Sequence, residues 1–347
     1  MRTEVSKFAL IQATSVGDAI AKLSSYGVDN SAVISGGTDV ISRNKERIAT
    51  MMPQYLIDIS GLPLNYITPS SGGFKIGATT PVIDVANNTS VPAVLSQAAN
   101  AVATPQIQSM GTVAGDVLQE VWCEYVRNDF PCWRNGGNVC YGAIGDNRYY
   151  HSIFGGRLCY ANHAGDLAPA LTALNATATI QSQTGTSNVS MTDLIPGINV
   201  INGRVKENIV AWNEILTEFQ IPAPASGSVS AFYKVRDRGT WDFALASAAV
   251  VLNVSGSTIS SARVVLGGVD VKPHIATSAE SYLAGKSVPL SEADIAGAAT
   301  AAVDGAQPLA TGTGNSYRVT IASGAVSKAL RSIYTPNQPT VYAPLSS

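Results

Sequence analysis

The stretch that decides the fold is Ala32-Val33-Ile34-Ser35-Gly36-Gly37-Thr38-Asp39-Val40. Its apolar start predicts a short buried strand, and the glycines that follow predict a tight turn before a helix. Small residues at such a turn let a diphosphate approach the backbone, whose exposed N–H groups supply hydrogen-bond donors. A plain turn is the alternative, because the G-x-G-x-x-G pattern of an ordinary Rossmann fold is absent.

A second loop with the same chemistry lies about 75 residues further on, at Gly111-Thr112-Val113-Ala114-Gly115-Asp116. It is also small, rich in backbone donors and flanked by a polar side chain. Two such loops are compatible with a site that holds the two ends of one dinucleotide. Two unrelated turns are the alternative.

Periodicity divides the chain into three parts and a tail, without an internal repeat. Residues 1–60 predict a small α/β unit, in which Ser15 is the expected N-cap of the first helix. Residues 61–222 predict a larger α+β unit, because hairpin and amphipathic-helix patterns both occur there. Residues 229–332 predict a sheet followed by helices, and residues 333–347 an extended tail. In the third part we expect a hairpin of 243–254 with 258–267, and helices near 278–285, 291–304 and 317–332.

The cysteines are crowded into a window of 37 residues, spaced C-x8-C-x7-C-x18-C: Cys123, Cys132, Cys140 and Cys159. Two disulfides are one interpretation, although no secretion signal is visible in the sequence. A structural zinc site usually shows close C-x2-4-C pairs, which are absent. An iron–sulfur cluster needs four converging thiolates and tolerates long loops between them. The spacing alone does not separate zinc from iron–sulfur.

The composition excludes several classes of function. The formal charge is 22 − 24 = −2 with no basic block, which argues against a nucleic-acid partner. No run approaches the ~20 apolar residues of a membrane span. Only 13% of the residues are charged, against about 25% in ordinary proteins. We therefore expect partner subunits to cover much of the surface, with a solvated surface of low charge as the alternative.

Four motifs in a fixed order carry a resemblance to a known family: Ser35–Asp39 (SGGTD), Ala103–Asp116 (ATPQIQSMGTVAGD), Gly165–Leu171 (GDLAPAL) and Tyr233–Arg236 (YKVR). Together they resemble the FAD-binding medium subunit of molybdenum hydroxylases, the xanthine dehydrogenase and carbon monoxide dehydrogenase flavoprotein family. The resemblance covers residues 1–332. It implies an α+β fold with a two-part FAD-binding domain, the small α/β unit plus the larger α+β unit, and a C-terminal domain of sheet and helices.

The cysteine window resembles a subgroup of this family with an additional [4Fe–4S] cluster, as in bacterial periplasmic-type aldehyde oxidoreductases and 4-hydroxybenzoyl-CoA reductase. The resemblance implies that the cluster lies in an insert at 120–160 and that iron–sulfur is favoured over zinc. Its ligands would be Cys123, Cys132, Cys140 and Cys159. Arg134 and Arg148 would offset the negative charge of the cluster, or would face acidic groups of a partner.

The resemblance also implies contacts to FAD. Residues 33–40 would wrap the diphosphate, and Thr112 would hydrogen-bond it from the second loop. Asp166 would contact the adenosine-side ribose, with a helix cap as the alternative. Lys234 would lie near the isoalloxazine ring, with a solvated lysine as the alternative. The expected cofactor-binding residues are Val33, Ile34, Ser35, Gly36, Gly37, Thr38, Asp39, Val40, Val102, Thr104, Gly111, Thr112, Gly115, Asp116, Asp166 and Lys234.

One position departs from the family's pattern. The second loop of the family commonly ends in Asn, where this chain has Asp116. A carboxylate there would lie near the phosphates of FAD, unless the side chain turns away.

The resemblance implies an enzyme subunit that makes no bond to the organic substrate itself. A large subunit with molybdenum cofactor would oxidise it, and electrons would pass through a [2Fe–2S] small subunit to FAD here and on to an external acceptor. An aldehyde oxidoreductase is favoured. The alternatives are a subunit of a 4-hydroxybenzoyl-CoA reductase-type enzyme and a structural subunit with a zinc-stapled loop. Residues 1–7 show no export signal, so we expect a cytoplasmic chain, or a periplasmic one exported with a signal-bearing partner.

Overall fold

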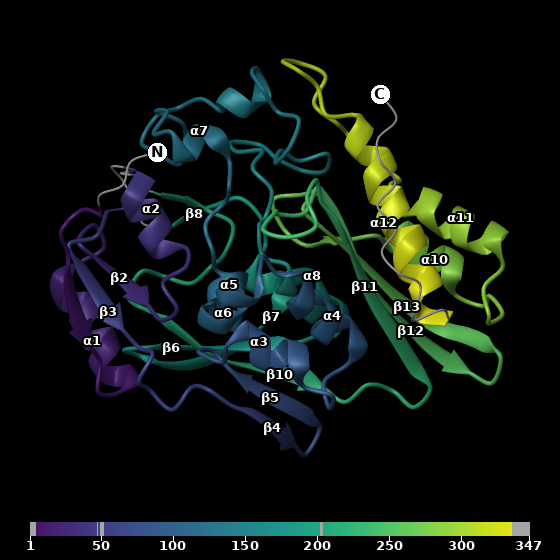
Figure 1. Ribbon diagram of the computed structural model, residues 1–347, viewed down its shortest axis with the longest axis horizontal. Coiled ribbons are helices and arrows are strands. Elements are labelled where there is room, and N and C mark those ends of the chain that lie inside the picture. The colour runs from purple at the N-terminus through teal and green to yellow at the C-terminus, as the bar shows by residue number, and fades with distance from the viewer. Residues whose placement is uncertain (1–4, 47, 49–51, 202–203, 335–347) are drawn as a thin grey trace.

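The computed structural model describes residues 5–46, 48, 52–201 and 204–334 (Figure 1). Within these residues the chain forms a small parallel sheet, a larger antiparallel sheet, a C-terminal antiparallel sheet and a two-stranded ribbon. This is the α+β architecture that the sequence predicts. Most of the tail expected at 333–347 lies outside the described residues. None of the described helices is long and apolar enough to cross a membrane.

The N-terminal unit is a three-stranded parallel sheet in the order β1 (Ala9–Gln12), β3 (Tyr55–Asp58), β2 (Ser31–Ile34). Helix α1 (Val16–Tyr26) begins as predicted, because the Ser15 hydroxyl accepts the N–H of Asp18 at 3.0 Å. The glycine loop follows the carboxyl end of β2 and leads into α2 (Val40–Glu46). A loop at this edge of a parallel sheet is where α/β proteins place ligands.

The second sheet has five antiparallel strands in the order β4 (Ile67–Ser70), β5 (Gly73–Gly77), β10 (Ile215–Pro222), β6 (Thr177–Ser182), β7 (Gly185–Ser190). The central strand β10 was not anticipated, because a bulge between Leu216 and Glu218 interrupts its alternation of apolar and polar residues. The helices that accompany this sheet are α3 (Val82–Asn87), α4 (Ala93–Ala101), α5 (Pro105–Met110), α6 (Val113–Val117), α8 (Leu167–Ala173) and α9 (Met191–Leu194). The ribbon consists of β8 (Asn199–Ile201) and β9 (Arg204–Lys206).

The C-terminal sheet has the order β11 (Ser228–Val235), β12 (Ala246–Ser255), β13 (Thr258–Gly267), β14 (His274–Ile275). The predicted hairpin is β12 with β13, and the predicted helices are α10 (Thr277–Leu283), α11 (Glu292–Ala301) and α12 (Tyr317–Tyr334). Both faces of β12 are buried. Val250 and Leu252 join the core under the C-terminal helices, whereas Ala249 and Val251 join the core of the five-stranded part. The sheet is thus a wall shared by the two halves of the molecule.

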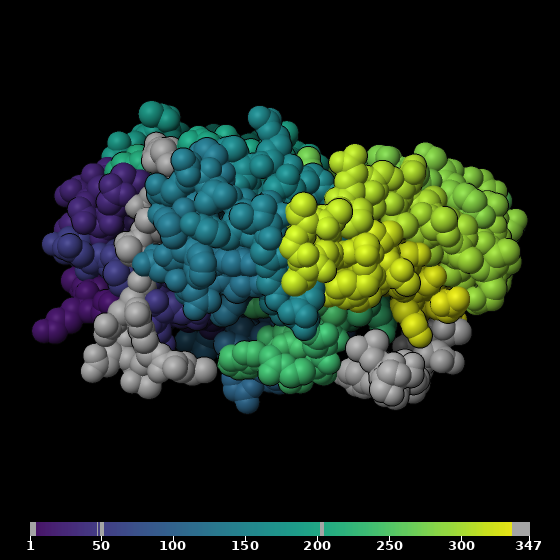
Figure 2. All heavy atoms as spheres, turned by 90° about the horizontal axis from the view of Figure 1, so that it is seen from above, coloured from purple at the N-terminus to yellow at the C-terminus, as the bar shows by residue number. Residues whose placement is uncertain are grey.

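The cysteine insert, residues 120–160, has little regular structure: α7 (Glu124–Arg127) and a 3-10 turn, Tyr141–Ala143. In Figure 2 the teal part of the chain, to which the insert belongs, lies between the purple N-terminal unit and the yellow C-terminal helix. Polar side chains attach the insert to the C-terminal domain. Asn147 donates to the carbonyl of Thr311 at 2.9 Å, and Asn315 donates to the carbonyl of His151 at 3.0 Å.

Candidate functional site

The two glycine loops lie directly against each other. A Cβ atom added to Gly36 would lie 1.7 Å from the carbonyl oxygen of Met110, so the backbones meet where no side chain fits. A Cβ atom on Gly111 would lie 3.6 Å from the Thr38 hydroxyl. Gly37 adopts φ +72°, in the left-handed region that favours glycine. The two loops therefore form one site, and the interpretation of two unrelated turns is wrong.

Local hydrogen bonds fix the second loop. The Thr112 hydroxyl accepts the N–H of Gly115 at 3.2 Å and caps helix α6. The backbone is held from both sides, because Val82 donates to the carbonyl of Gly111 at 2.9 Å and Val113 donates to that of Thr80 at 3.0 Å. The loop is thus built before any ligand arrives, which reduces the entropy lost on binding.

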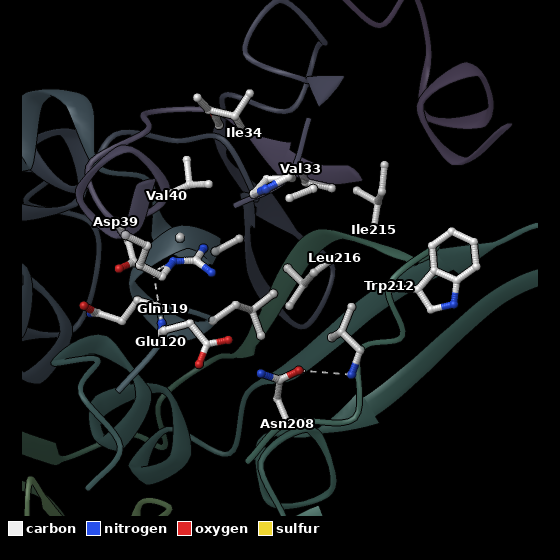
Figure 3. Close-up of a pocket in the computed structure, with 18 of the residues that line it drawn as sticks. Val33, Ile34, Asp39, Val40, Gln119, Glu120, Asn208, Trp212, Ile215 and Leu216 are labelled. Atoms are coloured by element: carbon white, nitrogen blue, oxygen red, sulfur yellow. Dashed lines mark hydrogen bonds and ion pairs between the residues drawn. The ribbon is translucent and has the colours of Figure 1, made fainter. Parts of the chain in front are cut away.

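A cavity of about 320 Å³ opens beside the two loops (Figure 3). This volume lies within the range of small-molecule sites. Figure 3 shows Asp39, Gln119 and Glu120 on one side of the cavity, and Ile215 and Trp212 on the other. The predicted cofactor residues that line it are Val33, Ile34, Ser35, Gly36, Gly37, Thr38, Asp39, Val40, Gly111, Thr112 and Gly115.

The wall between 201 and 216 was missed by sequence reasoning. It includes Asn208, Trp212, Ile215 and Leu216, from strand β10 and the segment before it. No glycine, charge or spacing pattern marks these residues. Only the pairing of β10 with β5 and β6 brings them to the cavity.

The other predicted cofactor residues do not line this cavity: Val102, Thr104, Asp116, Asp166 and Lys234. Asp166 and Lys234 form an ion pair of 2.6 Å, with side chains only 6% and 2% exposed. Lys234 also donates to the carbonyl of Ala101 at 3.1 Å. Lys234 is therefore not a solvated lysine. Its proposed position near the isoalloxazine ring stays a prediction.

Asp116 turns away from the loop and toward helix α8. Its carboxylate accepts the N–H of Leu167 at 2.8 Å. Asp166 occupies the N-cap position of α8 but makes no side-chain cap, so Asp116 performs that role from another part of the chain. Burial, with a smaller contribution from the charge of Asp166, raises the pKa of Asp116 to about 7. The expected carboxylate beside the FAD phosphates is thus directed elsewhere.

Thr104 and Val102 shape the turn between the cavity and Lys234. The Thr104 hydroxyl accepts the N–H of Ile107 at 3.4 Å and caps helix α5, and the Val102 carbonyl accepts from the Gln108 amide at 2.7 Å. Between them Ala103 adopts φ +31°, a conformation that costs free energy outside glycine. Their role at the flavin stays a prediction.

All four cysteines are free thiols. Cys123, Cys132 and Cys159 are buried in one apolar cluster with residues such as Val121, and Cys140 is half-buried. Burial raises the pKa of Cys123 to about 12, and the charge of Cys159 acts in the same direction. The two disulfides considered as one interpretation are not formed. Within the described part of the chain, no three His, Cys, Asp or Glu side chains are arranged to hold a metal ion.

Two side chains contact the sulfur atoms. The His151 Nε2 lies 3.4 Å from the Sγ of Cys123, and the Arg134 Nε donates to the Sγ of Cys159 at 3.3 Å. Arg134 thus lies beside a thiol, and its role toward a cluster stays a prediction. Arg148 does not, because it is exposed and pairs with Asp146 at 2.6 Å. The thiols and their donors fit an iron–sulfur ligand set in kind, although no metal-holding arrangement is formed.

Comparison with known proteins shows which family the chain belongs to. Residues 6–224 match the family described as the FAD binding domain in molybdopterin dehydrogenase, and residues 231–333 match the CO dehydrogenase flavoprotein C-terminal domain. The chain belongs to the FAD-binding medium-subunit family of molybdenum hydroxylases. The prediction made from the four motifs is confirmed.

Individual relatives agree with this family. The chain is 33% identical over 274 residues to the aldehyde oxidoreductase FAD-binding subunit of Escherichia coli (strain K12), covering 76% of this chain and 83% of the relative. It is 27% identical to the carbon monoxide dehydrogenase medium chain of Hydrogenophaga pseudoflava, covering 92% and 94%. A solved structure of carbon monoxide dehydrogenase from that organism superposes with a TM-score of 0.72 at 26% identity, covering 96% and 99%. The relatives are FAD subunits or medium chains of larger oxidoreductases.

The glycine loops fit the cofactor of this family. Gly36 lets the backbones of the two loops touch, and the cavity beside this contact is partly polar and partly apolar, as a dinucleotide requires. The residues in place to hold FAD are therefore the first loop, the second loop with Thr112, and the wall from Asn208 to Leu216.

Proposed function

We propose that the chain is the FAD and [4Fe–4S] electron-transfer subunit of a heterotrimeric molybdenum hydroxylase that oxidises aldehydes. The observation that carries the FAD part is the backbone contact of Gly36 with Met110, which joins both predicted loops into one site beside the cavity. The aldehyde part rests on the 33% identity with an aldehyde oxidoreductase subunit. The partners would be a large subunit with molybdenum cofactor and a small [2Fe–2S] subunit.

The chain's own residues bind and orient FAD. Residues 35–38 and Thr112 hold the diphosphate through backbone and hydroxyl groups. Asp166 fixes the ammonium group of Lys234 at 2.6 Å, so that a positive charge stays at one place in a buried region. Bound FAD supplies the exchange between single electrons and electron pairs. Substrate chemistry takes place on another chain.

The four cysteines would hold the [4Fe–4S] cluster. Support comes from their crowding into one insert, from the free state of all four thiols and from the burial of three of them in one apolar cluster. Arg134 donates to Cys159 at 3.3 Å, and hydrogen bonds of this kind to the sulfur atoms tune cluster potentials. Burial of the insert would also limit the access of solvent to the metal.

The relatives support the proposal of partner subunits, because they are named as an FAD-binding subunit and a medium chain. Met110, Ile144 and Trp241 are 58%, 65% and 57% exposed, in a protein with few surface charges. Contiguous exposed apolar patches mark interaction sites, whereas single exposed apolar residues are ordinary, so these three are only candidate contact residues for a partner.

The proposal is tested on the assembled complex, purified with its partners and kept free of oxygen. An aromatic aldehyde, an N-heterocycle and an aroyl-CoA thioester are each added, and the flavin absorbance is followed. We expect the aldehyde alone to bleach the flavin band. Bleaching by the heterocycle alone would contradict the aldehyde assignment, and reduction of the thioester by the pre-reduced complex would support the reverse direction of electron flow.

A further inference from the structure

A chain of polar contacts runs from the first glycine loop into the cysteine insert. It begins at Asp39, next to the loop, whose carboxylate accepts the backbone N–H of Glu120 at 3.0 Å (Figure 3). The Glu120 side chain in turn lies 3.4 Å from the NH1 group of Arg134. Arg134 then contacts the Sγ of Cys159 at 3.3 Å. Three side chains thus link the FAD cavity to a thiol of the insert.

Arg134 is the central residue of this chain of contacts. Its side chain is 1% exposed, it lines the FAD cavity, and its NH2 group pairs with the buried Glu207 at 2.7 Å. The guanidinium group is planar and rigid, so its donors cannot move independently. A displacement at Cys159 is therefore transmitted to Glu120 and Glu207.

A displacement of Arg134 would change the electrostatic environment of an anionic ligand in the cavity. Glu120 lines the cavity that would receive the FAD diphosphate, and Glu207 is buried close by. Burial acts against the charged form of Glu207, but the charge of Arg134 outweighs it and lowers the pKa of Glu207 below the ordinary value. Both carboxylates would repel a diphosphate if Arg134 moved away from them.

A second arginine connects the same two regions. Arg127, in the insert, pairs with Asp39 at 3.0 Å and with Glu46 at 3.1 Å. Its guanidinium group also lies over the ring of Trp122, 4.0 Å from the centroid. Arg127 fixes the start of the insert to the glycine loop, so that the contacts of Arg134 act between parts already held together.

We propose that Arg134 is a positioning residue that couples FAD binding to the cysteine insert, so that what engages the Cys159 sulfur changes how tightly the chain binds FAD. The inference rests on the proposed FAD site. By linkage the effect is reciprocal: bound FAD also changes how the insert holds a ligand at Cys159.

A double-mutant cycle tests this coupling on the full chain stripped of FAD. The dissociation constant of FAD is measured by fluorescence for the wild type, Cys159→Ala, Arg134→Lys and the double variant. Lysine keeps the charge beside Glu207 but cannot bridge three partners. We expect Cys159→Ala to weaken FAD binding about 10-fold when Arg134 is present and less than about 2-fold in Arg134→Lys.

The outcomes separate the inference from the proposed function. Equal effects of Cys159→Ala in both backgrounds, or no effect in either, would overturn the coupling but leave the FAD site intact. A wild-type chain that binds no FAD would overturn the proposed function instead. If Arg134→Lys does not fold, Glu120→Ala gives the same cycle, because it removes the side chain that Arg134 contacts and keeps the backbone N–H that donates to Asp39. Arg331→Gln, in an exposed pair with Glu292, is the control and is expected to show no coupling.

Discussion

The glycine-loop site and the cysteine insert are stabilised in opposite ways. The glycine loops are joined by backbone contact and lie between a parallel sheet and short helices, with Gly36 against Met110 and capped turns at Thr104 and Thr112. The insert has few regular elements and depends on buried polar side chains such as Arg134. The first site is preformed by the fold, whereas the second depends on groups whose charges need partners.

A buried arginine, Arg318, also attaches the C-terminal part of the insert to the C-terminal domain. The guanidinium group of Arg318, in α12, donates to the carbonyls of His151, Leu245 and Gly268. One arginine thus joins the end of the insert to two loops of the C-terminal sheet. Burial lowers the pKa of Arg318 to about 10. Arg318 thus adds a polar attachment to the apolar cluster around Cys123, Cys132 and Cys159 that also holds the insert.

The largest effect is expected at the backbone contact. In Gly36→Ala the new Cβ would collide with the Met110 carbonyl, so the loops must separate, and overpacking of this kind costs about 1–3 kcal/mol. We expect loss of bound FAD, measured as the flavin content of the purified chain. Gly72→Ala is the matched control, because nothing lies within 4 Å of its added Cβ. Normal flavin content in Gly36→Ala would show that the contact does not define the site.

The second effect is expected in the cysteine insert. Cys132→Ser removes a buried thiol, and we expect the iron content to fall from about four per chain to near zero. FAD supplied in excess should still bind, because the glycine loops are preformed. Iron is measured by metal analysis and flavin by absorbance on the same sample. Full retention of iron would exclude Cys132 as a ligand.

A third effect, on folding stability rather than on cofactor content, is expected at the buried arginine. Arg318→Met removes the arginine donor from the carbonyls of Leu245 and Gly268 and leaves that of His151 with Asn315 alone, which should lower the free energy of unfolding by about 2–4 kcal/mol. Arg331→Met, on the same helix but exposed, is the matched control. Both are measured by urea denaturation. Equal stabilities of the two variants would mean that the insert is held by other contacts.

The smallest effect is a dependence on pH at Asp116. Its pKa of about 7 lies above the ordinary value near 4, so the folded state binds more protons than the unfolded state between these values. Stability therefore falls as the pH rises from about 4 to 7. In Asp116→Asn this fall should be smaller, with a gain on the order of 2 kcal/mol at pH 8. Exposed Asp84→Asn is the control, and parallel curves for the two variants would contradict the assignment.

The two glycine loops could be predicted from the sequence, whereas the opposite wall of the cavity could not. Gly36, Gly37 and Thr112 carry local signals, since small residues and caps have direct backbone consequences. The buried strand β10 carried no clear signal, because the bulge between Leu216 and Glu218 interrupts its alternation, and the cavity wall at Trp212 was missed with it. The direction of the Asp116 side chain depended on a tertiary partner, Leu167, that no local pattern reveals.

The central claim is that FAD and an iron–sulfur cluster share this one chain. The direct measurement is the visible spectrum of the chain purified without oxygen, together with its iron, zinc and acid-labile sulfide content. We predict flavin bands on a broad brown absorbance, one FAD, and about four iron and four sulfide per chain. A colourless chain with one zinc and no sulfide would contradict the account.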